Sequence, residues 1–302
     1  MKASDTGREA KTAQADSIIL LSAFLVMIMV IGGGARSLAA ERSFVPLSPQ
    51  PTCSALAREV ELACHSWTEI AAAQKAGTRT AIIPIGGTEQ SGPYIAVGKH
   101  NVRAQLLADL IARQLGHTIV APVMAYVPEG STTPRRSHMR FPGTLSLPPD
   151  IFEAVVRGAA ESLRVQGFQT IVLLGDHGGY QRTLAHVATT LNAAWKHQGA
   201  QVLFVHNYYQ VIPTHYAELL RKRGYGNAVG QHAELSDTSL MLAVDPSLVR
   251  QEALRHAAQP HSADGVYGGD PRQATAELGR LGTDLQVQAA VEAISSFNRS
   301  HL

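Results

Sequence analysis

The chain has 302 residues, of which 45% are apolar and 17% are charged, so it is long enough to bury one large core. Its formal net charge is +2, and basic and acidic residues are interspersed. Because the sequence has no basic stripe interleaved with aromatic residues, its composition argues against a nucleic-acid-binding protein.

Residues 1–40 differ in character from the rest of the chain. The apolar stretch SIILLSAFLVMIMVIGGGA is followed by the small residues of SLAAE, an order typical of an export signal peptide. With Gly32–Ala35 included, the same stretch approaches the length of about 20 residues that an uncleaved membrane anchor needs. Both readings predict an exported protein, periplasmic or secreted, that contacts a membrane only through this segment.

Residues 41–65 are expected to form a linker and a short N-terminal segment, because they include the Pro- and Ser-rich stretch PLSPQPTCS. Cys53 and Cys64 lie here, and an oxidising compartment permits a disulfide. A continuous helix between them, at about 1.5 Å per residue, would separate the Cα atoms by roughly 16 Å, whereas a bridge tolerates less than about 7 Å. A disulfide therefore requires a break in the helix, and the sequence leaves both outcomes open.

From residue 66 to residue 302, short apolar runs alternate with helical patterns. Strands are expected at 80–85 (TAIIPI), 117–127 (HTIVAPVMAYV), 170–175 (TIVLLG) and 201–209 (QVLFVHNYY). Helices are expected at 66–77, 101–116 with Asn101 as N-cap, 148–167, 180–199, 236–244 with Asp237 among the candidate N-caps, and near 284–297. This alternation predicts an α/β domain with a mainly parallel sheet covered by helices on both faces.

Polar side chains gather at the ends of these strands and before a helix. Three loops each supply imidazole and carboxylate groups: Glu89 with His100, Asp176 with His177, and His232 with Glu234 and Asp237. Because ligands bind outside the carboxyl ends of parallel strands, these groups are expected to share one site. Imidazole nitrogen and carboxylate oxygen suit zinc, manganese or iron(II). Taken singly, Glu89 and Asp237 also suit helix caps, and the glycines of GDHGG suit a tight turn.

Four motifs occur in the order PIGGTEQSGP, FPGTLSL, LLGDHGG and HAELSDTS, and this order resembles the creatininase (creatinine amidohydrolase) family. The similarity runs from about Ser66 to Val249, and GVYGGDPRQATAELGR extends it towards the C-terminus. The resemblance implies a three-layer α/β/α sandwich, often assembled as a homo-hexamer. It also implies a metal-dependent amidohydrolase that cleaves C–N bonds of small cyclic or linear amides.

The resemblance also implies roles for individual residues. The family's metal-binding glutamate and histidine fall on Glu89 and His177, and a proton-transferring histidine falls on His232. Asp237 stands in place of a second functional glutamate and is expected to act with His232 in catalysis. The expected substrate-binding residues are Ser91, Tyr94, His138, Asp176 and Glu234. Lys99, which directly precedes His100, has two candidate roles: it could aid polarisation, but it is expected to be solvated.

The chain departs from the family at several ligand positions. Ser91 replaces a histidine that binds a second metal, His100 replaces an aspartate that bridges two metals, and Gly179 replaces a metal-binding glutamate. Asp176 replaces an asparagine. An imidazole has a single available lone pair and cannot bridge two cations. We therefore expect one divalent ion, with zinc as first choice and manganese or iron(II) as alternatives, bound by Glu89, His100 and His177.

These substitutions leave other functions open, and they make creatinine itself an unexpected substrate. A non-catalytic small-molecule-binding protein on the same fold would bind its ligand tightly without turnover. GDHGG also resembles the Asp-His metal pair of alkaline-phosphatase-like hydrolases, which would need a nucleophile near the metal, with Ser91 as the nearby candidate.

Overall fold

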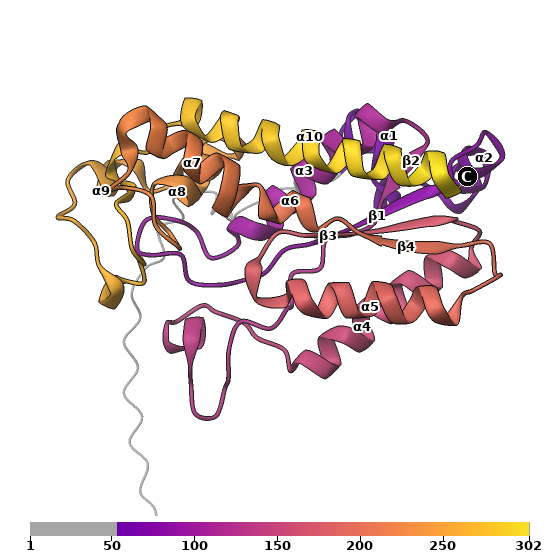
Figure 1. Cartoon of the computed structure of the whole chain (residues 1–302), viewed down its shortest axis with the longest axis horizontal. Helices are drawn as coiled ribbons and strands as arrows, with labels where there is room; N and C mark the ends of the chain where they lie inside the picture. The colour runs from indigo at the N-terminus through magenta and orange to yellow at the C-terminus, as the bar shows by residue number, and fades with distance from the viewer. Residues whose placement is uncertain (1–52, 302) are drawn as a thin grey trace, which may run out of the picture. The chain divides into compact units, whose positions relative to one another are not determined.

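The computed structural model describes residues 53–301 (Figure 1). The expectations for residues 1–40, a signal peptide or an anchor, lie outside the described residues, as does the linker up to residue 52. Within the described part of the chain, no helix is both long enough and apolar enough to cross a bilayer.

Cys53 and Cys64 form a disulfide, with their Cα atoms 5.2 Å apart. Helix α1 (Ala57–Val60) ends at Glu61, whose backbone is extended with ψ of 117°. The short 3₁₀ helix η1 (Leu62–Cys64) follows. The break at Glu61 turns the chain back on itself, so the condition that the sequence sets for this bridge is met.

The described residues contain a sheet of four parallel strands in the order β2-β1-β3-β4. The strands are β1 (Thr80–Ile85), β2 (Thr118–Val120), β3 (Thr170–Gly175) and β4 (Gln201–Phe204). The two central strands, β1 and β3, are buried along their whole length. This burial explains why both read as unbroken apolar runs in the sequence.

Helices cover both faces of the sheet, so the predicted three-layer α/β/α sandwich is confirmed (Figure 1). Ile83 and Leu173 pack on one face with helices α4 and α5, and Ile82 and Val172 pack on the other with α3 and α10. Successive strand side chains thus enter different cores. The covering helices are α3 (Lys99–Leu115), α4 (Pro149–Val165), α5 (Gln181–Ala194) and α10 (Ala276–His301).

Shorter helices complete the described part of the fold. They are α2 (Trp67–Lys75), α6 (His206–Gln210), α7 (Ala217–Leu220), α8 (Leu235–Val244) and α9 (Gln251–Arg255). Short 3₁₀ turns include η2 (Ser137–Arg140) and η3 (Gly178–Tyr180), and both carry residues of the site described below.

The start of helix α3 differs from the prediction. The helix begins at Lys99 after Gly98, and Asn101 is therefore not its N-cap. The side chain of Asn101 instead accepts a hydrogen bond from the amide of Gly87 at 2.9 Å and donates one to the hydroxyl of Thr88 at 3.1 Å. These bonds hold the loop after β1 against α3.

Other boundaries were also predicted wrongly. Strand β2 ends at Val120, and β4 ends at Phe204 because the residues that follow form helix α6. Glu234 rather than Asp237 caps α8, since the Glu234 carboxylate accepts a hydrogen bond from the amide of Ser236 at 2.8 Å. The last helix, α10, begins at Ala276 rather than near residue 284.

Candidate metal centre and active site

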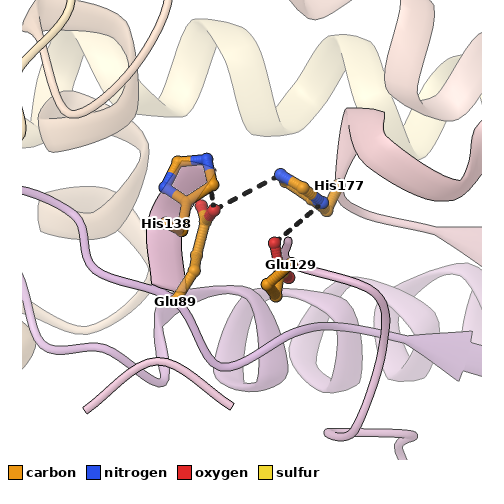
Figure 2. Close-up of side chains that lie close together, drawn as sticks. All are labelled: Glu89, Glu129, His138 and His177. Atoms are coloured by element: carbon orange, nitrogen blue, oxygen red, sulfur yellow. Dashed lines mark ion pairs between the residues drawn. The ribbon is translucent and has the colours of Figure 1, made fainter. Parts of the chain in front are cut away.

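The loops that leave the carboxyl ends of the strands carry the candidate site. Glu89 follows β1, Glu129 follows β2, and His177 follows β3. His138 lies on the 3₁₀ turn η2. Figure 2 shows these four side chains pointing toward one another from separate segments of the chain.

Glu89, Glu129, His138 and His177 form a group in which one ligand atom from each residue lies within 4.8 Å of the others. The Oε2 atom of Glu89 lies 3.2 Å from Nε2 of His138 and 3.3 Å from Nε2 of His177. The Nδ1 atom of His177 lies 3.5 Å from Oε2 of Glu129 (Figure 2). We call these four residues the metal-ligand group, because two carboxylates and two imidazoles form a donor set typical of zinc.

Several oxygen atoms of this group lie near imidazole nitrogens but form no hydrogen bond within the described part of the chain. The Oε2 atom of Glu89 and both carboxylate oxygens of Glu129 are buried and have no hydrogen-bond partner within residues 53–301. Leaving such an atom unsatisfied costs about 1–3 kcal/mol, so buried oxygens normally have a partner. A cation between the carboxylates would supply one. The unpaired atoms and the donor set therefore fit a divalent metal ion.

The pKa values of the two carboxyl groups in this group are shifted in opposite directions. Burial and the negative charge of Glu89 raise the pKa of Glu129 to about 9. Burial acts on Glu89 in the same direction, but His177, His100 and Lys99 outweigh it and hold the pKa of Glu89 well below its usual value. The surroundings thus favour one ionised and one protonated carboxyl group in this geometry.

His100 lies between two carboxylates. Its Nδ1 atom is 2.6 Å from Oδ2 of Asp176, and its Nε2 atom is 2.8 Å from Oε1 of Glu89. The sequence placed His100 among the metal ligands, but the structure places it outside the metal-ligand group and engages both ring nitrogens in hydrogen bonds. In this arrangement His100 orients Glu89, as the residues behind a metal ligand commonly do.

Asp176 is held from three sides. It accepts hydrogen bonds from Nε of Arg103 at 2.9 Å and from the hydroxyl of Tyr208 at 2.8 Å, in addition to its contact with His100. Burial would raise the pKa of Asp176, but Arg103 and His100 outweigh it and lower that pKa. Asp176 therefore stays ionised and fixes His100 in place.

Lys99 is fully buried, so the expectation that it is solvated was wrong. Its Nζ atom lies 2.7 Å from Oδ2 of Asp237 and 3.6 Å from Oε1 of Glu89. The earlier start of α3 places Lys99 in the first turn of the helix, where it faces the site. Burial would raise the pKa of Asp237, but its contacts with Lys99, His232 and Arg103 outweigh burial and hold that pKa far below its usual value.

His232 lies beside the metal-ligand group. Its Nε2 atom is 2.9 Å from the carbonyl oxygen of Gln90, and its Nδ1 atom is 3.6 Å from Oε1 of Glu89 and 3.8 Å from Oδ2 of Asp237. A carbonyl only accepts, so Nε2 donates and Nδ1 of the neutral ring carries the lone pair. Burial and Lys99 lower the pKa of His232 to about 4, which keeps the ring neutral near pH 7.

A cavity of about 510 Å³ opens beside these residues. Most of the residues that the sequence singled out line it: His100, His138, Asp176, His177, His232, Glu234 and Asp237. Burial and the charge of Asp237 raise the pKa of Glu234 to about 7.

Two expected substrate-binding residues lie elsewhere. Ser91 is buried, and Tyr94 packs against an apolar cluster that includes Ile95 and Met241. Neither residue lines the cavity as the structure of residues 53–301 defines it.

The sequence analysis did not single out Glu129. This residue follows the expected strand 117–127 after a single proline, so it met the same strand-end criterion that identified Glu89 and His177. Arg103 was also passed over, because a charged residue in a helical pattern normally faces solvent.

Comparisons with known proteins agree with this architecture. Residues 63–294 match the family model described as creatinine amidohydrolase (creatininase). The mycofactocin precursor peptide peptidase of Mycolicibacterium smegmatis is 29% identical over 115 residues, which cover 36% of this chain and 44% of that protein. The 3-dehydro-scyllo-inosose hydrolase of Thermotoga maritima is 26% identical over 172 residues, which cover 57% and 52%. The chain spans about half the length of these curated relatives.

Solved creatininase structures share the fold. A creatininase in its Mn form has a TM-score of 0.65 at 22% sequence identity, and the match covers 79% of this chain and 98% of that chain. A variant creatininase of the Zn-Zn type has a TM-score of 0.63 with the same identity and coverage. At this level of identity the likeness establishes the fold alone.

Proposed function

The chain belongs to the creatininase family, and from that premise we propose that it is a metal-dependent hydrolase that cleaves the C–N bond of an amide, lactam or formamide. The observation that carries this proposal is the metal-ligand group, in which buried carboxylate oxygens without a hydrogen-bond partner among the described residues converge with two imidazoles. Both curated relatives are named for hydrolytic activities, one as a peptidase and one as a hydrolase.

Glu89 and His177 would hold one divalent ion, and Glu129 and His138 would complete its protein ligands. Zinc is the first choice for this donor set, and manganese and iron(II) suit the same atoms. The Mn and Zn-Zn forms of solved creatininases support these choices. When bound, such an ion acts as a Lewis acid that polarises a carbonyl oxygen and lowers the pKa of a water molecule.

His232 is the residue that we propose to move the proton. Its Nε2 atom is fixed on the carbonyl of Gln90, so the lone pair on Nδ1 faces Glu89 and Asp237. The neutral ring can accept a proton from the attacking water and return it to the leaving nitrogen. Asp237, anchored by Lys99, stabilises the charged form of His232 between these two transfers.

We also propose that the substrate is a small molecule, since the cavity volume of about 510 Å³ falls in the range of small-ligand sites. Export to the periplasm or beyond is supported by the apolar stretch at 17–35 and by the Cys53–Cys64 disulfide. The family resemblance supports a homo-oligomer.

Metal analysis of the purified full-length chain tests the ligand assignment. The unaltered protein should hold about one equivalent of metal per chain, and Glu89→Gln, Glu129→Gln and His177→Asn should each lower the metal affinity at least about tenfold. His186→Asn is the matched control, because His186 is 60% exposed on α5. Unchanged metal content in both the Glu89 and the His177 variant would reject the assignment.

A substrate screen tests the reaction. Lactams, formamides and cyclic ureas would be incubated with the protein and added zinc, manganese or iron(II). We expect sustained product release that falls at least about 100-fold in His232→Asn while metal binding is kept. Tight binding without any turnover would instead establish the non-catalytic binding protein.

A further inference from the structure

Helix α6 presents two neighbouring tyrosines with different surroundings. The hydroxyl of Tyr208 is buried and donates a hydrogen bond to Oδ1 of Asp176 at 2.8 Å. Tyr209 is half-buried and lines the cavity of about 510 Å³ beside the metal-ligand group. No residue between 53 and 301 forms a hydrogen bond with the Tyr209 hydroxyl. The mechanism proposed above does not use Tyr209.

The Tyr209 side chain lies against Gly178, where a Cβ atom would collide with it. A Cβ atom on Gly178 would lie 3.0 Å from Cζ of Tyr209 and closer still to the hydroxyl oxygen. Any larger residue at this position would therefore displace the hydroxyl. Because Gly178 directly follows His177, the hydroxyl lies against the loop that supplies a metal ligand.

Asp237 offers an acceptor to the same cavity. Its Oδ2 atom accepts hydrogen bonds from Lys99 and from the amide of Ala233. The nearest cation to its Oδ1 atom, Nη1 of Arg103, is 3.8 Å away, which is too far for a hydrogen bond. The Asp237 side chain is 16% exposed. Burial and the charge of Asp237 raise the pKa of Tyr209, so the phenol keeps its proton and acts as a donor.

Each of the two cations at this wall of the cavity is paired with a carboxylate. Lys99 pairs with Asp237, and Arg103 pairs with Asp176. Behind them, Nη1 of Arg103 and Oε1 of Gln286 have no hydrogen-bond partner in the described part of the chain, although both residues line the cavity. The wall therefore combines spare donors and acceptors with cations that already have a partner. Such a wall favours an uncharged group that both accepts and donates hydrogen bonds, because an unpaired ion would be costly there.

We propose that Tyr209 and Asp237 form a specificity subsite for an uncharged carboxamide or urea group of the substrate, distinct from the bond that is cleaved. The Tyr209 hydroxyl donates to the C=O of this group, and Oδ1 of Asp237 accepts from its N–H. The inference rests on the proposed function, because the subsite would bind a second group of the substrate whose C–N bond is cleaved. Binding at the subsite requires neither metal nor turnover.

Ligand-observed NMR on the full-length chain in EDTA tests the subsite with four probes of similar shape. Propionamide has both a C=O and N–H groups, butanone and N,N-dimethylpropionamide have the C=O alone, and propionate is charged. Propionamide should bind about three- to tenfold more tightly than each of the others, the net effect of one hydrogen bond. Tyr209→Phe should lower the affinity for propionamide about three- to tenfold, because the C=O loses its donor. Tyr126→Phe, a control at a position 61% exposed, should leave that affinity unchanged.

Two outcomes would overturn the subsite. One is equal affinity of the unaltered protein for all four probes, a comparison that needs no variant. The other is an affinity for propionamide that is unchanged in Tyr209→Phe after its melting curve has shown that it is folded. Neither outcome bears on the hydrolase proposal, because the binding is measured without metal and without turnover.

Discussion

His100 and Asp176 are bonded to each other, with Nδ1 of the imidazole 2.6 Å from Oδ2 of the carboxylate. The family resemblance assigns an aspartate to position 100 and an asparagine to position 176, so both positions carry a different residue type in this chain. The pair keeps one carboxylate, which lies directly after β3 rather than on α3. Because Arg103 also holds Asp176, the two substitutions depend on each other.

The first prediction tests this dependence. His100→Asp alone would put a third carboxylate beside Glu89 and Asp176, and we expect it to lower the free energy of unfolding by roughly 3–5 kcal/mol, as breaking a buried ion pair does. Adding Asp176→Asn should restore a large part of this loss. Urea denaturation of the metal-free single and double variants measures both effects. Additive losses would contradict the coupling between positions 100 and 176.

The second prediction compares two ion pairs of equal length. Lys99 lies 2.7 Å from Asp237 with a fully buried side chain, and Lys222 lies 2.7 Å from Glu218 with a side chain that is 72% exposed. Lys99→Met should cost roughly 3–5 kcal/mol, because Asp237 would be left as an uncompensated charge. Lys222→Met should cost less than about 1 kcal/mol. Equal melting temperatures for the two variants would show that Lys99 is not the required counter-charge.

Much of the sheet could be predicted from the sequence, because its central strands are buried on both faces and therefore read as unbroken apolar runs. TAIIPI and TIVLLG became β1 and β3 with the predicted bounds. The strand-end criterion also brought Glu89 and His177 together, since the carboxyl ends of parallel strands lie at one edge. The strand predicted at QVLFVHNYY was wrong at its end, because β4 stops at Phe204 and Tyr208 and Tyr209 belong to α6.

The partners of the charged residues could not be predicted. Lys99 was expected in the loop before the helix, and Arg103 on the surface of that helix. Periodicity gives the face of a helix but not the carboxylates that meet it from distant loops. Asp237 on α8 and Asp176 after β3 supply those partners. The same limit applies to His100, whose hydrogen bonds to Glu89 and Asp176 depend on the packing of α3 against the loops.

The third prediction concerns stability and pH. Burial and the charge of Glu61 raise the pKa of Asp109 on α3 to about 7, from an ordinary value of 3.8. Between these values the folded protein keeps a proton that the unfolded chain releases, so stability falls as pH rises from about 4 to 7. Asp109→Asn removes this titration. The difference in stability between the variant and the unaltered protein should therefore favour the variant more at pH 8 than at pH 5. Urea denaturation at both values measures the change.

Asp150→Asn serves as the control for this pH effect, because Asp150 is exposed at the start of α4. Its effect on the free energy of unfolding should be the same at pH 5 and pH 8. If Asp109→Asn shows no more pH dependence than this control, the raised pKa of Asp109 does not set the pH response.

The last prediction contrasts two helical glycines. A Cβ atom on Gly279 of α10 would overlap the carbonyl of Ser239 on α8 and lie 2.8 Å from Cβ of Ala243, whereas a Cβ on Gly158 of α4 meets nothing within 4 Å. Gly279→Ala should therefore cost about 1–3 kcal/mol through overpacking. Gly158→Ala should stabilise the protein by about 0.5–1 kcal/mol, because alanine favours a helix.

Since α8 carries Asp237, Gly279→Ala should also weaken catalysis, and Gly158→Ala should not. Thermal melts and turnover of both variants measure these effects, and a Gly279→Ala protein that is as stable and active as Gly158→Ala would show that α8 can move away from α10 without cost.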